Sequence, residues 1–316
     1  MSVIFCGDLV LPYHTDVDYS AILPLFKNHR TIVNFEGSIL KDEKETTLYR
    51  WNDKFSLYSC PKVLNVLKDL NVEVVSLCNN HILDYQHDIN ETIDILKKYN
   101  IESWGLKNHD VWKSKLNGKP LFVITFATFS NEHSLPLFSP LKVIEEIKEI
   151  RQQNKDSYIV VFPHWGIEKF YYPEPADRSL AHRMIDAGVD LIVGHHPHVI
   201  QPIEIYKGKH IFYSLGNFIS TQEKPDQLVG AILSVQLEKT TEPDGTVRCS
   251  VLSPRLLPTV THYDAGKSNV RTYLFRDYTE ALTKAHGVRK AYPDFSLEMI
   301  QSIARENIDP EFLQLT

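Results

Sequence analysis

The sequence of 316 residues is poor in cysteine and has neither a long apolar run nor a block of basic residues. Its four cysteines form no C-x-x-C pair, which argues against a disulfide framework, and Cys6, Cys78 and Cys249 lie in or beside apolar runs, which is typical of buried thiols. No stretch approaches the roughly 18 to 20 apolar residues of a membrane span. The N-terminal MSVIFCGDLVLP lacks a basic region and is interrupted by Asp8, unlike a signal peptide.

Charge and glycine pattern exclude two further classes of protein. The formal net charge is −6, so a general nucleic-acid-binding surface is not expected. No G-x-G-x-x-G motif follows an apolar strand, which argues against a dinucleotide-binding protein. We therefore expect a reduced, cytoplasmic, water-soluble protein without a nucleic-acid partner or a membrane span.

The first 220 residues alternate short apolar runs with amphipathic segments, which predicts an α/β fold. With 43% hydrophobic residues, the chain can bury a sizeable core. Expected strands cover residues 3–6, 31–35, 72–77, 121–127, 158–162 and 190–194. Expected helices cover residues 61–70, 89–100, 141–154 and 177–189, the last ending at Gly188 as its C-cap.

The pattern changes after residue 202. Apolar runs alternate with polar residues up to about 262 and are divided by a Lys-Gly turn and by PDG, which predicts antiparallel hairpins. The tail, 277–316, is charged and helical in pattern. Without a linker or a repeat, we expect one domain over 1–316, with the motifs in 3–220 and hairpins followed by a helical tail in 221–316.

Polar side chains follow five of the expected strands. They include carboxylates, carboxamides and imidazoles: Asp8, Glu36, Asn79, Asn80, His81, Asp84, His164, Glu168, His195, His196 and His198. In open α/β sheets, ligands bind outside the carboxyl ends of strands. Imidazole and carboxylate suit Zn²⁺, Mn²⁺ or Fe, and carboxamide oxygen suits harder ions such as Mg²⁺.

Each of these residues also has a plain structural interpretation. Asp8 is equally suited to a helix N-cap or a turn, and Asn79 and Asn80 to capping a helix. His196 and His198 are harder to explain in this way, because side chains at i and i+2 of an extended segment project to one face. We expect Pro197 to hold that segment extended. The joint occurrence at every strand end favours a metal site.

Six motifs in order carry a resemblance to a known family: FCGDLVL, VNFEGSI, CNNHILDY, FPHWGIE, VGHHPHVIQPIE and FYSLGNFI. They resemble the successive motifs of the bacterial CapA, or poly-γ-glutamate capsule synthesis, family of the calcineurin-like metallophosphoesterase superfamily. The resemblance covers residues 3 to about 220. It implies a four-layer α/β/β/α sandwich with a centre holding one or two divalent ions (Mn, Zn, Fe or Mg).

The resemblance also assigns residues. Its metal ligands fall on Asp8, Glu36, Asn80, His164, His196 and His198, and the histidine that assists the leaving group falls on His81. Asp84, three residues after His81, is expected to orient it. We assign substrate contacts to His195, Trp165, Glu168 and Asn217. For His195, two interpretations stay open: it supports the metal ligands or contacts the substrate, or it only packs in the interior. The aromatic residues in 169–175 either wall the pocket or pack on the sheet edge.

Two departures from the superfamily pattern change the expected metal loading. Val10 stands where most members carry a histidine ligand, and Glu36 replaces an aspartate that bridges two ions. We therefore expect one tightly held ion and a second that is weak or absent.

Two functions follow from the resemblance. The first is a metal-dependent hydrolase in capsule or poly-γ-glutamate metabolism, with water attacking a phosphoester or a γ-glutamyl amide of a small-molecule or polymer substrate. The alternative is a non-catalytic accessory component of polymer synthesis, a partner of a membrane complex. His81 favours the enzyme, because a structural metal site does not need it. The sequence does not fix the oligomeric state.

Overall fold

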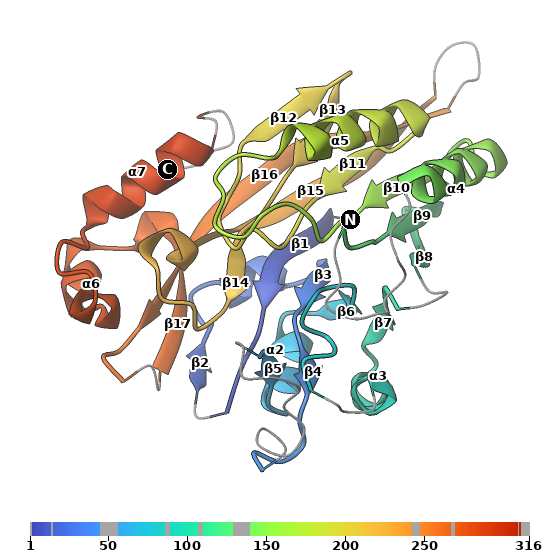
Figure 1. Ribbon diagram of the computed structural model, residues 1–316. Coiled ribbons are helices and arrows are strands. Elements are labelled where there is room, and N and C mark those ends of the chain that lie inside the picture. Colours follow the sequence, from blue (N-terminus) through green and yellow to red (C-terminus); the bar gives the residue numbers. More distant parts are fainter. Residues whose placement is uncertain are drawn as a thin grey trace.

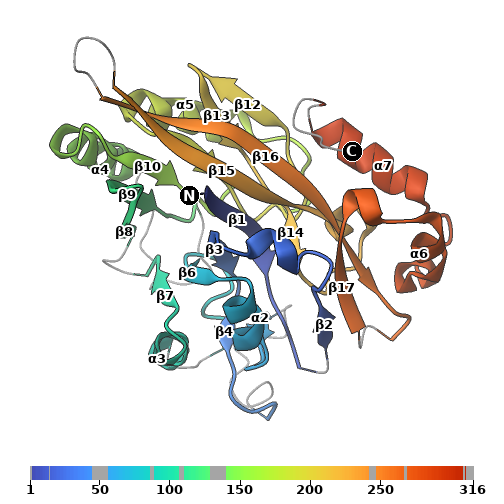
Figure 2. The same cartoon turned by 180° about the vertical axis from the view of Figure 1, so that it is seen from behind.

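A computed structural model describes residues 2–13, 15–44, 56–85, 89–106, 110–128, 140–241, 247–266, 269–308 and 310 (Figures 1 and 2). Two large sheets dominate it. The nine-stranded sheet has the order β2-β17-β16-β15-β1-β3-β6-β7, with β14 pairing β1. Its strands are β1 (Ser2–Leu9), β2 (Asp16–Asp18), β3 (Arg30–Phe35), β6 (Val72–Ser76), β7 (Glu102–Trp104), β14 (Asn217–Ile219), β15 (Val229–Thr241), β16 (Val247–Tyr263) and β17 (Asn269–Leu274).

The six-stranded sheet has the order β12-β13-β11-β10-β9-β8. Its strands are β8 (Val111–Leu116), β9 (Lys119–Ile124), β10 (Tyr158–Val161), β11 (Leu191–Val193), β12 (Ile203–Tyr206) and β13 (Lys209–Phe212). A small third sheet pairs β4 (Ser38–Ile39) with β5 (Tyr58–Ser59).

The helices are α2 (Val63–Asp69), α3 (Ile89–Lys98), α4 (Pro140–Gln153), α5 (Pro175–Ala187), α6 (Glu280–Ala285) and α7 (Leu297–Asn307). Short 3₁₀ turns are η1 (Leu23–Phe26), η2 (Pro225–Leu228), η3 (Phe275–Asp277) and η4 (Gly287–Lys290). Helix α5 ends at Gly188 with φ 120°, a value that suits glycine, as expected for its C-cap.

Alternation along the strands explains how the layers pack. In β1, Val3 and Phe5 face a core shared with Tyr158 and Val160 of β10, whereas Ile4 and Cys6 face the side covered by α2 and α3. The other face of β10 packs against α4 and α5, which lie together over the six-stranded sheet (Figure 1). The order helix, sheet, sheet, helix confirms the expected four-layer α/β/β/α sandwich.

The six expected strands and four expected helices are present, with ends displaced by a few residues. The hairpins are also present: β12 pairs β13 around Lys207 and Gly208, and β15 pairs β16. The PDG turn lies outside the described residues, as does the side chain of Cys249, while Cys6 and Cys78 are buried free thiols.

The sequence predicts antiparallel strands after residue 202, but the structure also has parallel pairs there. β13 pairs β11 in parallel and β14 pairs β1 in parallel, so this region extends both sheets. β15 lies directly beside β1, which supports the expectation of one domain over 1–316; that expectation stays a prediction.

Candidate metal centre

The predicted polar residues gather where strands of both sheets end. Asp8, near the end of β1, pairs with Asn34 of β3 and Asn217 of β14. Glu36 follows β3, Asn80 and His81 follow β6, His164 follows β10, and His195, His196 and His198 follow β11. Parallel strands bring their carboxyl ends to one edge, which explains why the spacing in the sequence located this cluster.

Three of these residues form what we call the inner donor set: Asp8, Glu36 and His164. One potential ligand atom from each lies within 4.8 Å of the others. The residues are almost fully buried, with 1%, 2% and 1% of their surface exposed. Among the described residues, Glu36 Oε1 has no hydrogen-bond partner, and the imidazole nitrogen His164 Nε2 is 3.7 Å away. A buried carboxylate in this state fits a site for a cation.

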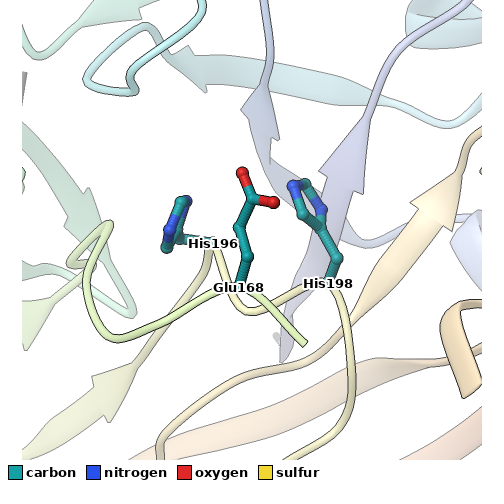
Figure 3. Close-up of side chains that lie close together, drawn as sticks. All are labelled: Glu168, His196 and His198. Carbon is teal, nitrogen blue, oxygen red and sulfur yellow. The ribbon is translucent and has the colours of Figure 1, made fainter. Parts of the chain in front are cut away.

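A second group, the outer donor set, consists of Glu168, His196 and His198. Its donor atoms also lie within 4.8 Å of one another. Figure 3 shows the Glu168 side chain standing between the two imidazoles. The two sets adjoin at His198, whose Nδ1 is 3.2 Å from Asp8 Oδ2 and whose Nε2 is 3.9 Å from Glu36 Oε2.

The backbone that carries these histidines differs from the expectation. His196 has φ 97° and His198 has φ 58°, so the segment around Pro197 is a tight loop and not an extended strand. Non-glycine residues in this region cost about 1–3 kcal/mol each, and they occur mainly at functional sites. The two imidazoles still reach one place, but through loop curvature instead of strand alternation.

Asn217 holds His198 in place, and its assignment to substrate contact stays a prediction. Its Oδ1 lies 3.1 Å from His198 Nδ1, and its Nδ2 donates to the Gln227 carbonyl at 3.0 Å. Since Asp8 Oδ2 and Asn217 Oδ1 are both acceptors, His198 Nδ1 carries the proton, and Nε2 is left to act as a ligand atom.

Asn34 is a site residue that the sequence analysis did not select. Its Nδ2 donates to Asp8 Oδ1 at 2.7 Å and lies 3.3 Å from His164 Nδ1, so it fixes two members of the inner donor set. The sequence did contain a signal, because Asn34 precedes Glu36 by two positions, a spacing at which side chains of an extended segment project to one side. His164 Nε2 lies 2.8 Å from Asn80 Oδ1, which brings the predicted carboxamide ligand to the same centre.

His81 is coupled to Asp84 as expected. His81 Nδ1 lies 2.6 Å from Asp84 Oδ2, which also accepts from the Leu57 backbone N–H at 2.8 Å. Residues 81–84 form a turn and not a helix, closed by the Asp84 N–H bonding the His81 carbonyl. Burial alone would lower the pKa of His81, but the bond to Asp84 and the charge of Glu36 outweigh it and raise that pKa.

Burial and mutual charge perturb the donors strongly. Burial raises the pKa of Glu36 to about 7. For Asp8, burial is outweighed by the hydrogen bond and charge of His198, which lower its pKa. Burial would lower the pKa of His198, but Glu36 and Asp8 raise it to about 9. Burial, together with the charge of His198, lowers the pKa of His196 to about 3. Such opposed shifts within one cluster are typical of functional sites.

Two further residues assigned to substrate contact, Trp165 and His195, lie in the interior, and their assignment stays a prediction. Trp165 is 1% exposed, donates from Nε1 to the Tyr213 carbonyl at 2.9 Å, and belongs to the core beneath α4 and α5. His195 is 1% exposed, packs against Phe162 with ring centroids 4.0 Å apart, and bonds the Cys6 carbonyl at 3.2 Å. Both are interior side chains, which is consistent with the packing interpretation of His195.

The close approach at Gly194 shows why this loop begins with glycine. A Cβ there would lie 2.1 Å from the Tyr213 carbonyl oxygen and 2.4 Å from Trp165 Nε1.

The aromatic residues that follow Glu168 in the sequence are exposed: 55% for Phe170, 39% for Tyr171 and 64% for Tyr172. These three residues form an exposed aromatic segment that lies two to four positions after Glu168 along the chain.

Comparison with known proteins identifies the family. Residues 3–222 match the family described as "Bacterial capsule synthesis protein PGA_cap". The chain belongs to this family. A relative called "PGA biosynthesis protein CapA", from Bacillus subtilis, is 31% identical over 275 residues, which are 79% of this chain and 70% of that protein. "Capsule biosynthesis protein CapA" of Bacillus anthracis is 32% identical over 234 residues, which are 68% of this chain and 56% of that protein. The chain therefore spans little more than half of the B. anthracis relative.

A solved structure supports the fold of this capsule-synthesis family member. The 5′-nucleotidase precursor of Thermus thermophilus superposes with a TM-score of 0.50 at 16% identity, covering 97% of this chain and 58% of that one. The fold is thus of the metallophosphoesterase type. Within the described part of the chain, none of the helices combines the length and apolar character needed to cross a membrane.

Proposed function

We propose that the protein is a metal-dependent hydrolase of capsule or poly-γ-glutamate metabolism that cleaves a phosphoester or a γ-glutamyl amide. The observation that carries this proposal is the His81–Asp84 pair beside the inner donor set. A site that used its ion only to stabilise the fold would not need a buried histidine oriented by a carboxylate.

The donor chemistry fits a divalent ion of the Zn²⁺, Mn²⁺ or Fe class, and includes oxygen donors suited to Mg²⁺. The residues that would hold it are Asp8, Glu36, Asn80, His164, His196 and His198. A bound divalent ion supplies Lewis acidity and lowers the pKa of a coordinated water.

The chain's own residues supply the remaining chemistry. His81 delivers a proton to the leaving group, and Asp84 keeps its Nδ1 occupied so that Nε2 is the reacting nitrogen. Asn34 fixes Asp8 and His164, while Asn217 fixes His198, so the donors need little reorganisation. The exposed aromatic residues 170–172 offer a polymer an apolar surface beside the site.

The test is an assay of metal-stripped protein reloaded with Mn²⁺ or Zn²⁺ against aryl phosphomonoesters, aryl phosphodiesters and γ-glutamyl anilides. We expect turnover of at least one class only in the loaded protein, and loss of that turnover in His81→Ala. No turnover of any class by the loaded parent would reject the hydrolase.

That outcome would favour the second candidate, a non-catalytic accessory component that acts with a membrane complex. One relative supports this candidate by name: a "Probable polyglutamine synthesis accessory protein" of Mycobacterium tuberculosis is 26% identical over 248 residues. Val10 also supports the accessory role, because it stands where most members of the superfamily carry a histidine that binds metal.

A further inference from the structure

A pocket of about 620 Å³ lies between β7, β8 and α4, and none of its lining residues belongs to the two donor sets. β7 and β8 are edge strands of the nine-stranded and the six-stranded sheet, and Figures 1 and 2 both show them on the same side of the molecule as α4. The volume is within the range of pockets that hold small ligands, roughly 300–1,000 Å³. The wall includes Glu102 and Trp104 of β7, Asp110 and Trp112 at the start of β8, and Glu146 and Glu149 of α4.

Negative charge predominates in this pocket. Four of the wall residues just named are carboxylates, and Lys113 is the one cationic residue that lines the pocket in the described part of the chain. Lys142 adds a second ammonium group, 3.8 Å from Asp110 Oδ2, on a side chain that is 71% exposed. Four negative charges against two positive ones leave a net attraction for a cationic ligand.

A buried tryptophan holds one of these carboxylates in place. Trp112 is 5% exposed, and its Nε1 donates to Glu102 Oε2 at 2.7 Å. Glu102 itself is exposed, so this bond fixes a carboxylate that would otherwise move freely in solvent. Trp104 and Trp112, with ring centroids 6.4 Å apart, supply the apolar part of the wall, against which the aliphatic stem of a lysine or arginine can pack.

Two buried polar atoms of the pocket residues make no hydrogen bond with the described part of the chain. They are Trp104 Nε1, in a residue that is 2% exposed, and Glu146 Oε2. Burial, together with the charge of Asp110, raises the pKa of Glu146. A buried polar group without a partner costs about 1–3 kcal/mol. Because the indole N–H is a donor and the carboxylate an acceptor, a ligand that presents a cation beside a carbonyl oxygen satisfies both.

The spacing of the carboxylates does not suit a metal ion. Among the described residues, three potential ligand atoms come within 4.8 Å of one another only in the inner and outer donor sets. Metal–oxygen distances of about 2.0–2.6 Å require several ligand atoms to lie closer together than the carboxylates of this pocket do. Separated carboxylates instead suit a ligand with several N–H donors, such as the guanidinium of arginine.

We infer that this pocket, which we call the acidic pocket, binds a basic segment of a partner polypeptide. A lysine or arginine side chain of the segment pairs with Glu102 and Glu146, and a main-chain carbonyl next to it accepts the indole N–H of Trp104. A free polyamine supplies the cation but lacks the carbonyl, so the unpaired indole favours a peptide. The inference goes beyond the proposed function and does not depend on the metal centre.

The test is fluorescence anisotropy of fluorescein-labelled tetra-arginine and tetralysine peptides with amidated C-termini, titrated with the whole protein at about 0.15 M salt, where attraction between distant surface charges is screened. We expect saturable binding that the unlabelled peptide displaces. Glu102→Gln and Glu146→Gln should each weaken it by about 10-fold or more, because each removes a charge-assisted hydrogen bond. Trp104→Phe keeps an aromatic ring but removes the N–H. It should weaken peptide binding by about 5-fold and leave competition by spermine unchanged.

The matched control is Glu145→Gln, which removes the same charge one position away on α4, at an exposed residue outside the pocket. It should bind the peptides like the parent. Equal weakening by Glu145→Gln and Glu146→Gln, or no saturable binding by the parent, would overturn the inference, since only general attraction to an acidic surface would remain. Spermine binding as tight as that of the peptides, with Trp104→Phe unable to separate the two, would also overturn it in favour of a small polyamine. Melting temperatures show whether Trp104→Phe folds; if it does not, Glu102→Gln and the spermine competition still decide the question.

Discussion

His81 Nδ1 lies 2.6 Å from Asp84 Oδ2, and both side chains are largely withdrawn from solvent, with 10% and 12% exposed. The carboxylate also accepts the Leu57 N–H, so it is held from two sides. This arrangement fixes the ring of His81 and directs Nε2 away from Asp84. This is the geometry that the proposed hydrolase requires of an oriented proton donor.

Replacement of His81 by alanine should slow hydrolysis without changing metal content. We expect a loss of roughly 10² to 10⁴-fold in kcat, the usual contribution of a positioned general acid. The loss should shrink for aryl esters with good leaving groups, which need no proton. Rates across esters of graded leaving-group pKa check this, and equal losses along the series would remove His81 from the acid role.

Asp84→Asn provides a graded control for the same prediction. Asparagine keeps an acceptor near Nδ1 but removes the charge, so its loss in kcat should be smaller than that of His81→Ala and should show the same trend with leaving group. A loss in Asp84→Asn that is independent of the leaving group would indicate a role in folding the turn, not in orienting His81.

His198→Ala should uncouple the protein's stability from its metal. The ion's binding free energy adds to the stability of the folded state, about 2.7 kcal/mol at a free ion concentration of 100 times Kd. The parent's Tm should therefore rise when Mn²⁺ or Zn²⁺ is added to metal-free protein, and the variant's Tm should not. Thermal denaturation with and without chelator measures this, together with elemental analysis. His81→Ala, with an unaltered metal response, is the matched control.

The sequence predicted that polar residues cluster where they lie at, or shortly after, the end of a regular strand. Asp8, Glu36 and His164 lie together because parallel strands end at one edge, while their role as metal ligands stays a prediction. The helix end at Gly188 could be predicted because glycine tolerates positive φ. These features depend on local periodicity, which a single sequence contains.

The features that the sequence did not predict depend on loop geometry and long-range packing. Trp165 is buried because its neighbour Gly194 has no side chain and leaves room for the indole, and no periodicity in the sequence reveals this burial. Glu168 reaches the histidines through backbone bonds between two loops. The extended form expected at Pro197 was wrong because His196 and His198 adopt positive φ, which local propensity does not predict.

Tyr172→Ala should weaken binding of a long substrate without affecting chemistry. Tyr172 is 64% exposed and follows Glu168 by four positions, so we expect a polymer bound at the site to contact it. Loss of about 1 kcal/mol of contact corresponds to a roughly 5-fold higher KM for a polymer, with kcat unchanged. Steady-state kinetics on polymer and on a small aryl substrate measure the difference. Tyr99→Ala, at an exposed tyrosine after α3, is the control, and an equal effect on the small substrate would contradict the prediction.

The C-terminal region contains a histidine whose protonation should destabilise the fold. His286 is 2% exposed; its Nε2 donates to the Thr261 carbonyl at 3.1 Å, and its Nδ1 accepts the Val288 N–H at 3.0 Å. This pattern requires the neutral ring, because a proton on Nδ1 would remove the acceptor for Val288. The neighbouring ring of His262, with centroids 4.6 Å apart, adds like charge when protonated.

Burial lowers the pKa of His286 to about 4, from 6.5 in the unfolded chain. Since the unfolded state binds the proton more readily, this residue's contribution is complete above pH 6.5 and is lost as the pH falls from about 6.5 towards 4. The loss should be on the order of 2–3 kcal/mol. His286→Gln keeps an amide donor and acceptor but cannot titrate. Urea unfolding of both proteins between pH 7.5 and 4.5 tests the prediction. Other titrating groups cancel in the difference, so the parent's advantage over the variant should shrink with acid, and a constant difference would contradict it.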